Sequence, residues 1–342
     1  MNKFLKKTLI FIINVYFKVF ISWFIHFFQF VNPNSNGKAF FFTFHKRPNF
    51  IFRTFLDSKL DYSDYAIIVQ GPIVTKFNFT LNTILLYLKL YPKVNLVLST
   101  WENSNSNDLK KFHRLPIKIC LNKYPSHSGI LNLNFQLIST QSALNNLNPS
   151  VKYCLKSRSD TRVFSKNALL DMKNLLEIFP TKVHNVQKRI IGIDINTSKY
   201  IPFNFSDLIQ FGDVNDMKIY WNCPLSKFNI TLKDYLSFVH TLKDYYFNPN
   251  PEITLCKNYL DRIGQSHNNT LENYYEQLRK VFLIIDKEMI NLYWHKYSID
   301  EFNWSFNYKT NDSNSRLRFM DWVAIFNGQL PNNFDSNIFA TQ

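Results

Sequence analysis

Residues 65–101 read YAIIVQGPIVTKFNFTLNTILLYLKLYPKVNLVLSTW, and the stretch alternates between two kinds of apolar pattern. Residues 66–69 are a short apolar run that ends at Gln70-Gly71-Pro72, which predicts a buried strand followed by a turn. Across residues 79–91 the apolar side chains recur at helical spacing, and a proline follows. Residues 95–99 predict a second strand. The stretch therefore predicts a strand, a helix and a second strand parallel to the first.

The same alternation continues through the chain and predicts the fold class. Further strands are expected at 117–121, 151–155 and 190–193, and further helices at 131–147 and 168–179. The later part is expected to be mostly helical, with helices at 214–221, 232–246, 252–262 and 271–281 and one more strand at 282–285. The chain is therefore predicted to be an α/β protein with a mostly parallel, Rossmann-like sheet flanked by helices. In such sheets the ligand binds at the carboxyl ends of the strands.

The positive charge of the chain is concentrated near its beginning. The 342 residues include 40 Lys and Arg and 25 Asp and Glu, for a net charge of +15. The first 56 residues contain eight Lys and Arg and no acid, so the other 286 carry +7 (15 − 8). Because the later cations form no clustered stripe, we expect no nucleic-acid partner. The hydrophobic fraction of 46% excludes a disordered chain.

Residues 8–31 are nearly apolar and long enough to be a membrane helix. The polar residues in this segment are Asn14, Lys18, Ser22, His26 and Gln29, which fall on one helical face. Basic residues flank both ends. We therefore expect residues 1–31 to form a membrane-associated helix that lies on anionic lipid, followed by a linker at 32–63. A spanning helix and a buried helix of a soluble domain are the alternatives.

Several motifs of the α/β region occur in a characteristic order. They are IVQGPI at 68–73, LSTWE at 98–102, the spaced residues Asn132, Gln136 and Ser139, LKSRSD at 155–160, DLIQFG at 207–212, and Pro251-Glu252. In this order and spacing the chain resembles the WavE-type lipopolysaccharide-synthesis family over about residues 64–265. No single motif is specific by itself.

The resemblance implies a bacterial glycosyltransferase of the GT-A type that acts in surface-polysaccharide assembly. It implies a nucleotide-sugar donor and a lipid-linked or lipopolysaccharide acceptor. The growing polysaccharide would be lipopolysaccharide core, O-antigen or capsule. Residues 64–200 would then form the nucleotide-sugar-binding half and residues 201–342 the mostly helical, acceptor-binding half. With the N-terminal helix, it implies a location at the cytoplasmic face of the inner membrane.

The donor is expected at the strand ends. The expected donor-binding residues are Gln70, Gly71, Pro72, Thr100, Glu102, Asn132, Gln136, Lys156, Arg158 and Asp160. Gly71 permits a close backbone approach, and Asn132 and Gln136 are one helical turn apart. The structural alternatives are an ordinary turn, a solvated loop acid and polar residues on a helix surface.

Asp160 is the candidate metal ligand, so any dependence of the enzyme on a metal ion would involve this residue. GT-A enzymes usually carry a D-x-D motif at this strand end, whereas this chain has Arg158-Ser159-Asp160. Asp160 either holds Mg²⁺ or Mn²⁺, or binds sugar hydroxyls while Lys156, Arg158 or Arg162 neutralises phosphate. A simple surface pair of Arg158 with Asp160 is the third interpretation.

An inverting transferase needs a carboxylate to accept the proton of the acceptor hydroxyl. Glu252, which follows Pro251 at a helix start, is the first candidate, and Asp207 is the second. An acid in the first turn also suits the helix dipole without any catalytic role. The alternative functions are a transferase of phospho-sugar or phospho-alditol units and a non-catalytic, basic membrane scaffold.

Overall fold

The structure, a computed structural model, describes residues 60–239, 244, 247–296 and 316–329. The chain divides into two compact units, Met1–Phe55 and Leu56–Gln342, and the described residues belong to the second. The helix expected at 1–31 lies outside the described residues, as does the linker at 32–63 apart from its last four residues. Within the described ranges, no helix combines the length and the apolar character needed to cross a bilayer.

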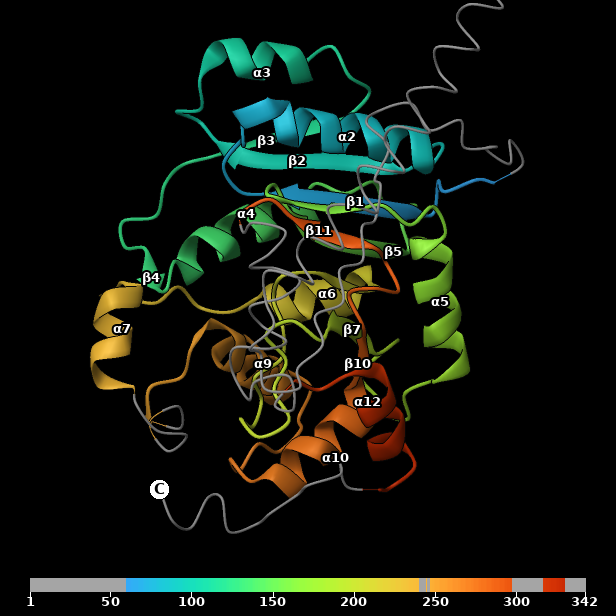
Figure 1. Ribbon diagram of the computed structural model, residues 1–342, viewed down its shortest axis with the longest axis vertical. Helices are drawn as coiled ribbons and strands as arrows, with labels where there is room; N and C mark the ends of the chain where they lie inside the picture. Colours follow the sequence, from blue (N-terminus) through green and yellow to red (C-terminus); the bar gives the residue numbers. More distant parts are fainter. Residues whose placement is uncertain (1–59, 240–243, 245–246, 297–315, 330–342) are drawn as a thin grey trace, which may run out of the picture. The chain divides into compact units, whose positions relative to one another are not determined.

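A seven-stranded sheet forms the centre of this unit, in the order β10-β7-β8-β5-β1-β2-β3 (Figure 1). Its strands are β1 (Tyr65–Gln70), β2 (Asn95–Trp101), β3 (Lys118–Asn122), β5 (Tyr153–Arg158), β7 (Ile190–Ile193), β8 (Gln210–Asp213) and β10 (Phe282–Ile285). β1 is parallel to β2 and β5, and β8 alone runs antiparallel to its neighbours, β5 and β7. The predicted α/β class with a mostly parallel sheet is confirmed.

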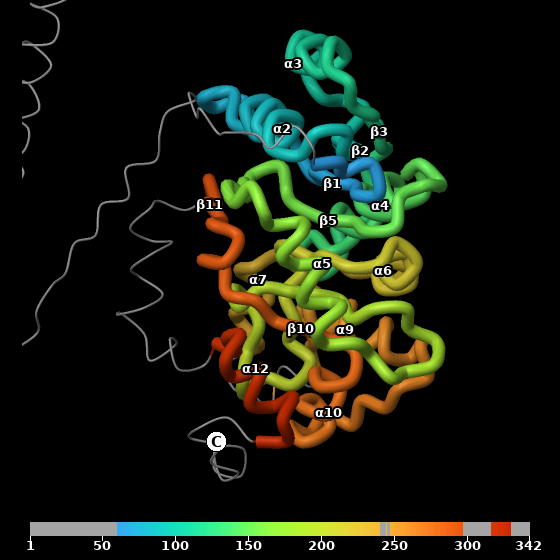
Figure 2. The backbone as a smooth tube through the Cα atoms, turned by 90° about the vertical axis from the view of Figure 1, so that its right-hand side faces the viewer, coloured from blue at the N-terminus to red at the C-terminus, as the bar shows by residue number. Residues whose placement is uncertain are grey.

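Helices cover the sheet. They are α2 (Phe79–Leu90), α3 (Ser106–Phe112), α4 (Leu133–Asn145), α5 (Ala168–Ile178), α6 (Val214–Trp221), α7 (Leu232–Phe238), α9 (Pro251–Arg262), α10 (Leu271–Val281) and α12 (Phe319–Phe326). α4 packs on β1, β2 and β3, and α6 packs between α4 and α9. Figure 2 shows α2 on the opposite side of β1 and β2 from α4. All six residues of β1 are consequently buried, as expected for a central parallel strand with helices on both faces.

Two further strand pairs lie outside the central sheet. β6 (Thr161–Val163) is antiparallel to β11 (Leu292–Trp294), and β4 (Gly129–Ile130) is parallel to β9 (Asn229–Ile230). Each pair joins segments about 100 residues or more apart, so periodicity within one segment does not predict it.

Some element boundaries differ from those predicted. The polar stretch after β2 contains α3, which the side chain of Asn105 caps by accepting a hydrogen bond from the Asn107 N–H at 2.8 Å. α4 begins at Leu133 rather than Leu131, because Leu131 and Asn132 have φ of 49° and 69°. Asn132 therefore precedes the helix instead of sharing its face with Gln136, which corrects that expectation.

The second half of the chain has the expected helices and also contributes strands to the central sheet. β8 and β10 come from residues 201–342, yet both belong to the same sheet as β1. A boundary at residue 200 therefore crosses the sheet, and the division into a donor-binding half and an acceptor-binding half stays a prediction. The strand expected at 282–285 is confirmed as β10, while β8 is too short for its alternation to be recognised in the sequence.

Candidate active site

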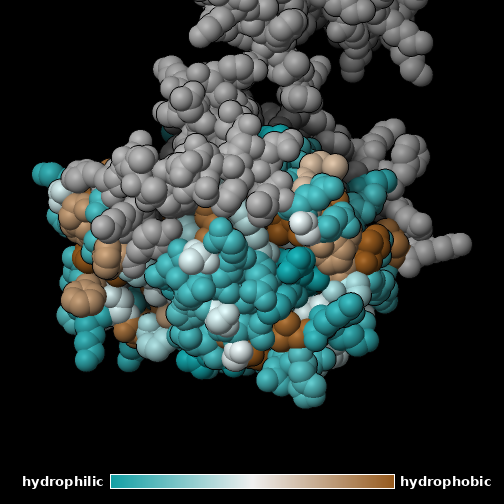
Figure 3. Space-filling view, turned by 90° about the horizontal axis from the view of Figure 1, so that it is seen from below, coloured by the Kyte–Doolittle hydropathy of each residue, from teal (hydrophilic) through white to brown (hydrophobic). Residues whose placement is uncertain are grey.

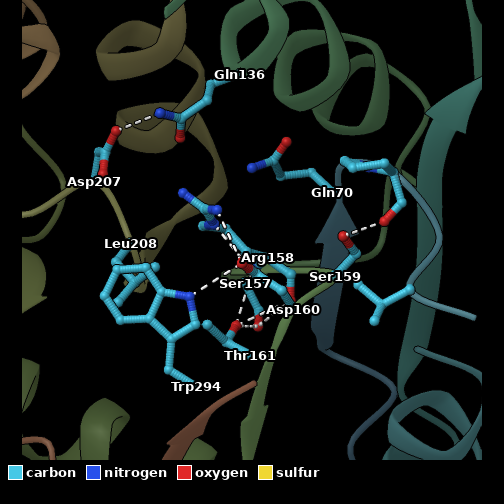
Figure 4. A network of polar contacts seen from close by, with 12 residues as sticks. Gln70, Gln136, Ser157, Arg158, Ser159, Asp160, Thr161, Asp207, Leu208 and Trp294 are labelled. Carbon is cyan, nitrogen blue, oxygen red and sulfur yellow. Dashed lines mark hydrogen bonds and ion pairs between the residues drawn. The ribbon is translucent and has the colours of Figure 1, made fainter. Parts of the chain in front are cut away.

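The polar residues singled out in the sequence gather at one edge of the sheet. β1 and β5 are parallel and end there at Gln70 and Arg158. Because β8 runs antiparallel, it begins at this edge, with Asp207 just before it. Figure 4 shows Gln70, Gln136, Arg158, Asp160 and Asp207 around this point.

The loops after β1 and β5 are tied together by Ser159. The Ser159 N–H donates to the Gln70 carbonyl at 2.8 Å, and the Ser159 hydroxyl donates to the Pro72 carbonyl at 2.6 Å (Figure 4). The Gly71 N–H donates to the Ser99 carbonyl at 2.9 Å. The predicted donor-binding loop at residues 70–72 is thus held by hydrogen bonds to neighbouring strands and loops. The side chain of Gln70 is buried and accepts a hydrogen bond from Ser139.

Gly71 has a φ of +117°, and a Cβ added there would lie 3.0 Å from the Ser159 hydroxyl. We expect Gly71→Ala to lower the free energy of unfolding by at least about 2 kcal/mol, through backbone strain and displacement of Ser159. Gly264→Ala is the matched control, because its φ of +70° is also positive but no atom lies within 4 Å of the added Cβ. It should cost only about 1 kcal/mol. Urea unfolding measures both, and equal losses would contradict the close contact with Ser159.

Asp160 is held in an ion pair. Arg158 Nε donates to Asp160 Oδ1 at 2.9 Å, and a second guanidinium nitrogen donates to Oδ2 at 3.0 Å (Figure 4). Trp294 Nε1 also donates to Oδ2, at 3.0 Å, and the His295 N–H donates to the Asp160 carbonyl. Burial by itself would raise the pKa of Asp160, but the charge and hydrogen bonds of Arg158 and the Trp294 hydrogen bond lower it overall. Asp160 is therefore a firmly held anion.

This donor set does not fit a divalent cation at Asp160 as arranged. Both carboxylate oxygens accept hydrogen bonds, and the guanidinium of Arg158 stands where a cation would need to approach. In the part of the chain that the structure describes, no three His, Cys, Asp or Glu side chains group as metal ligands. In this arrangement Asp160 is an ion-pair partner of Arg158, and its role as a metal ligand stays a prediction. With side chains only 28% and 14% exposed, the pair is also not the loose surface pair considered above.

Lys156 lies below this edge and holds Asp207. Its ammonium donates to the Asp207 carbonyl and, at 3.2 Å, to Gln136 Oε1, and it lies 4.5 Å from the centre of the Trp221 ring. Gln136 Nε2 in turn donates to Asp207 Oδ2 at 2.6 Å. Burial lowers the pKa of Lys156 to about 8, although the nearby Asp207 opposes the shift. Because Lys156 is fully buried, it positions Asp207 and does not present a cation to a phosphate.

Glu252 lies in the first turn of α9, which Asn250 caps by accepting a hydrogen bond from the Ile253 N–H at 2.8 Å. Glu252 is half-buried, and burial together with the charge of Asp207 raises its pKa far above the ordinary value. The charge of Asp207 thus acts on Glu252, the other carboxylate expected to be catalytic.

A chain of asparagine amides holds the Glu252 carboxylate. Asn196 Nδ2 donates to Glu252 Oε1 at 3.2 Å, and the Asn196 carbonyl accepts from Asn204 Nδ2 at 2.9 Å. Asn250 Nδ2 donates to Asn204 Oδ1 at 2.7 Å, which closes the chain onto the start of α9. Asparagine is common in the loops of this chain, so the sequence carries no signal for these particular residues.

Three of the predicted donor-binding residues lie apart from these contacts. Thr100 is fully buried, with its hydroxyl 3.3 Å from the Ser104 hydroxyl. Glu102 and Asn132 are exposed, the first just after β2 and the second just before α4. Trp294 is the opposite case: it follows Asp160 by 134 residues and reaches it because β11 pairs with β6.

Comparison with known proteins gives a family and several distant structural likenesses. The family model described as WavE lipopolysaccharide synthesis matches residues 65–327. Comparison with curated proteins gives no match. S. aureus TarS (residues 1–349) shows 12% identity and a TM-score of 0.33, covering 82% of this chain and 75% of that one. A glycosyltransferase involved in glycosylating the major capsid of PBCV-1 shows 14% identity and a TM-score of 0.30, covering 64% and 92%.

A third likeness is to the 4-diphosphocytidyl-2C-methyl-D-erythritol synthase of Anaerococcus prevotii. It shows 11% identity and a TM-score of 0.31, and it covers 56% of this chain and 85% of that one. With all three TM-scores below 0.5, nothing about the activity of this chain is taken from these structures.

Proposed function

We propose that this chain, which belongs to the WavE lipopolysaccharide synthesis family, is a glycosyltransferase that moves a sugar from a nucleotide-sugar donor to a surface-polysaccharide acceptor. The match over residues 65–327 confirms the family expected from the motifs. It covers every residue of the edge described above, from Gln70 to Trp294. We further propose that the enzyme is of the GT-A type and that the transferred sugar is a hexose.

The pair of carboxylates at Glu252 and Asp207 is the observation that supports sugar transfer most directly. Glu252 is half-buried and has a raised pKa, which suits a group that must accept a proton near neutral pH. Asp207 is more deeply buried and is fixed by Gln136. We therefore assign Glu252 as the general base and Asp207 as the charge that, in addition to burial, keeps the pKa of Glu252 high.

The proposed reaction is a direct displacement. The acceptor hydroxyl oxygen forms a bond to the anomeric carbon while the bond from that carbon to the diphosphate oxygen breaks. The hydroxyl proton passes to Glu252, and the nucleoside diphosphate leaves with the bonding electron pair. Arg158, at the end of β5 and paired with Asp160, is the cation that we place opposite the departing diphosphate.

The acceptor and location are further parts of the proposal. The family description supports an acceptor of the lipopolysaccharide class, which is anchored in a membrane by its lipid. The apolar, basic-flanked segment at residues 8–31 supports attachment to anionic lipid at the cytoplasmic face. Both rest on the family and the sequence, since residues 1–59 lie outside the described structure.

Thermal unfolding in a panel of nucleotides tests the proposed donor class. A nucleoside diphosphate and its sugar conjugate should raise Tm, because a ligand that binds only the native state stabilises it. During turnover with a lipopolysaccharide acceptor, the nucleotide sugar that raises Tm should be consumed, and its nucleoside diphosphate should be released. Release of CMP with transfer of a phosphate group would overturn the proposal in favour of a phospho-sugar or phospho-alditol transferase. Salt-sensitive DNA binding without nucleotide binding would favour a scaffold.

A further inference from the structure

An exposed apolar surface surrounds α7, at the side of the unit where Figure 1 places that helix. Six large apolar side chains there are between 37% and 73% exposed, and we call them the α7 patch: Leu225, Phe228, Leu232, Leu236, Phe238 and Phe247. Figure 3, seen from below, shows apolar residues on the same left-hand side. Single exposed apolar residues are ordinary, but six between residues 225 and 247 are unusual in one segment and are typical of an interaction surface.

α7 is not held by burial of its own apolar residues. Among its seven residues only Tyr235 is buried, while Leu232 and Leu236, one turn apart, both face outward. A capping box stabilises the helix start instead: Thr231 and Asp234 exchange hydrogen bonds between side chain and backbone. The apolar face of α7 is therefore presented outward by a locally stabilised helix.

The segment that carries the patch has a small excess of basic residues. Between residues 222 and 247 the lysines are Lys227, Lys233 and Lys243 and the acids are Asp234 and Asp244, and Lys227 and Lys233 are exposed. Asp234 is engaged in the capping box, where its hydrogen bonds with Thr231 lower its pKa. Leu and Phe side chains interleaved with Lys are the composition that suits the boundary between lipid headgroups and acyl chains.

Hydrogen bonds connect the buried side of α7 to the start of α9. The Tyr235 hydroxyl donates to the Asn248 carbonyl at 2.7 Å. Two residues later Asn250 caps α9 and connects to the amide chain that holds Glu252. The inner side of α7 is therefore connected to the start of α9, where Glu252 lies.

We infer that the α7 patch rests on an anionic lipid surface, as a contact separate from the N-terminal segment. This contact would bring the Glu252 side of the sheet edge to the headgroup level, where the sugar of a lipid-anchored acceptor lies. The inference uses the proposed function only for the choice of acceptor, because the lipid contact itself requires no turnover.

A fluorescent probe on the patch tests the contact in the full-length chain. The four native cysteines are buried, so Phe228→Cys offers the thiol that an NBD reagent labels selectively. Ile178→Cys on α5 is the matched control, because Ile178 is 65% exposed and α5 lies on the other side of the unit (Figure 1). With vesicles of phosphatidylcholine and phosphatidylglycerol, we expect a blue shift and higher emission at position 228 only. Vesicles of phosphatidylcholine alone should give a weaker response.

A second measurement uses vesicle affinity. Leu232→Asn with Leu236→Asn should weaken binding of the full-length chain to the same anionic vesicles by about tenfold, since contacts to one membrane add in free energy. Ile178→Asn with Met320→Asn removes apolar residues that are at least as exposed and should leave the affinity unchanged.

The opposite outcomes are distinct. If the chain binds vesicles while the probe at 228 stays unchanged, the patch does not touch lipid. If the shift at 228 depends on protein concentration without vesicles, the patch is a contact between copies of the chain, and the inference is overturned. Either result leaves the proposed transfer reaction standing, because donor binding and nucleoside diphosphate release are measured separately.

Discussion

Glu252→Gln is expected to lower kcat by at least about 100-fold while the chain still binds the donor. The amide cannot accept the proton of the acceptor hydroxyl, but it is close in shape to the protonated carboxyl group and can still accept the hydrogen bond from Asn196. Donor binding, measured by the thermal shift, should therefore change little. Turnover is followed by the release of nucleoside diphosphate.

Glu272→Gln is the control for a purely electrostatic role at a helix start. Glu272 is an exposed acid in the first turn of α10, the same kind of position that Glu252 occupies in α9. If both acids serve only the helix dipole, both substitutions cost about 0.3–1 kcal/mol of stability and neither affects turnover. A kcat that falls less than about tenfold in Glu252→Gln would place the base elsewhere.

The pH dependence of kcat is an independent test of Glu252 as the general base. The pKa of Glu252 is raised by burial and by the charge of Asp207, so the carboxyl group stays protonated to a higher pH than an ordinary glutamate. Only the ionised form accepts a proton, so kcat should rise with pH until that raised pKa is passed. Asp207→Asn removes the neighbouring charge and should move this rise toward lower pH. A profile with the same midpoint in both enzymes would contradict the coupling.

Arg158→Ala is expected to raise KM for the donor by roughly ten- to a hundredfold, the range of a charge-assisted hydrogen bond. The KM of Arg158→Lys should lie between that of the unaltered enzyme and that of Arg158→Ala. Lysine keeps the positive charge but loses the bidentate geometry seen with Asp160. Arg262→Ala is the control: this arginine is exposed in the last turn of α9 and donates a hydrogen bond to Asn258, one turn earlier in the same helix. It should leave KM unchanged.

Chelation separates the ion-pair interpretation from the metal interpretation of Asp160. With Arg158 and Trp294 occupying both carboxylate oxygens, turnover by the unaltered enzyme should be the same in EDTA as in Mn²⁺. If EDTA abolishes turnover and Mn²⁺ restores it, Asp160 must leave Arg158 during the reaction, and the metal-ligand role returns.

Local patterns in the sequence predicted the first part of the fold well. The apolar runs and helical periods from β1 to β5 depend on residues within one segment, and the structure has each expected strand and helix there within a few residues. α3 was missed because only Leu109 and Phe112 are buried in it, too few for a helical period. β8 was missed as a strand because four residues carry little alternation, although its segment was part of the motif order.

The site divides in the same way. Gln70, Gly71, Arg158 and Asp160 stand at or just after the ends of strands that the sequence marks, so their places at the edge of the sheet could be predicted, as could the place of Glu252 at a helix start. Their partners could not. Trp294 reaches Asp160 only through the pairing of β11 with β6, and Asn196 reaches Glu252 across 56 residues.

The family, the α/β class and the edge of the sheet at which the candidate site residues gather could all be predicted from the amino-acid sequence, because they depend on periodicity and on short motifs in order. What each charged group does at that edge depends on the folded chain. The buried ammonium of Lys156 donates hydrogen bonds to Asp207 and Gln136, while the carboxylate of Asp160 accepts hydrogen bonds from Arg158 and Trp294. Burial and partners set the state of an ionisable group, and both are properties of the folded chain. For the same reason, only the structure distinguishes the buried Tyr235 of α7 from Leu232 and Leu236, which face outward.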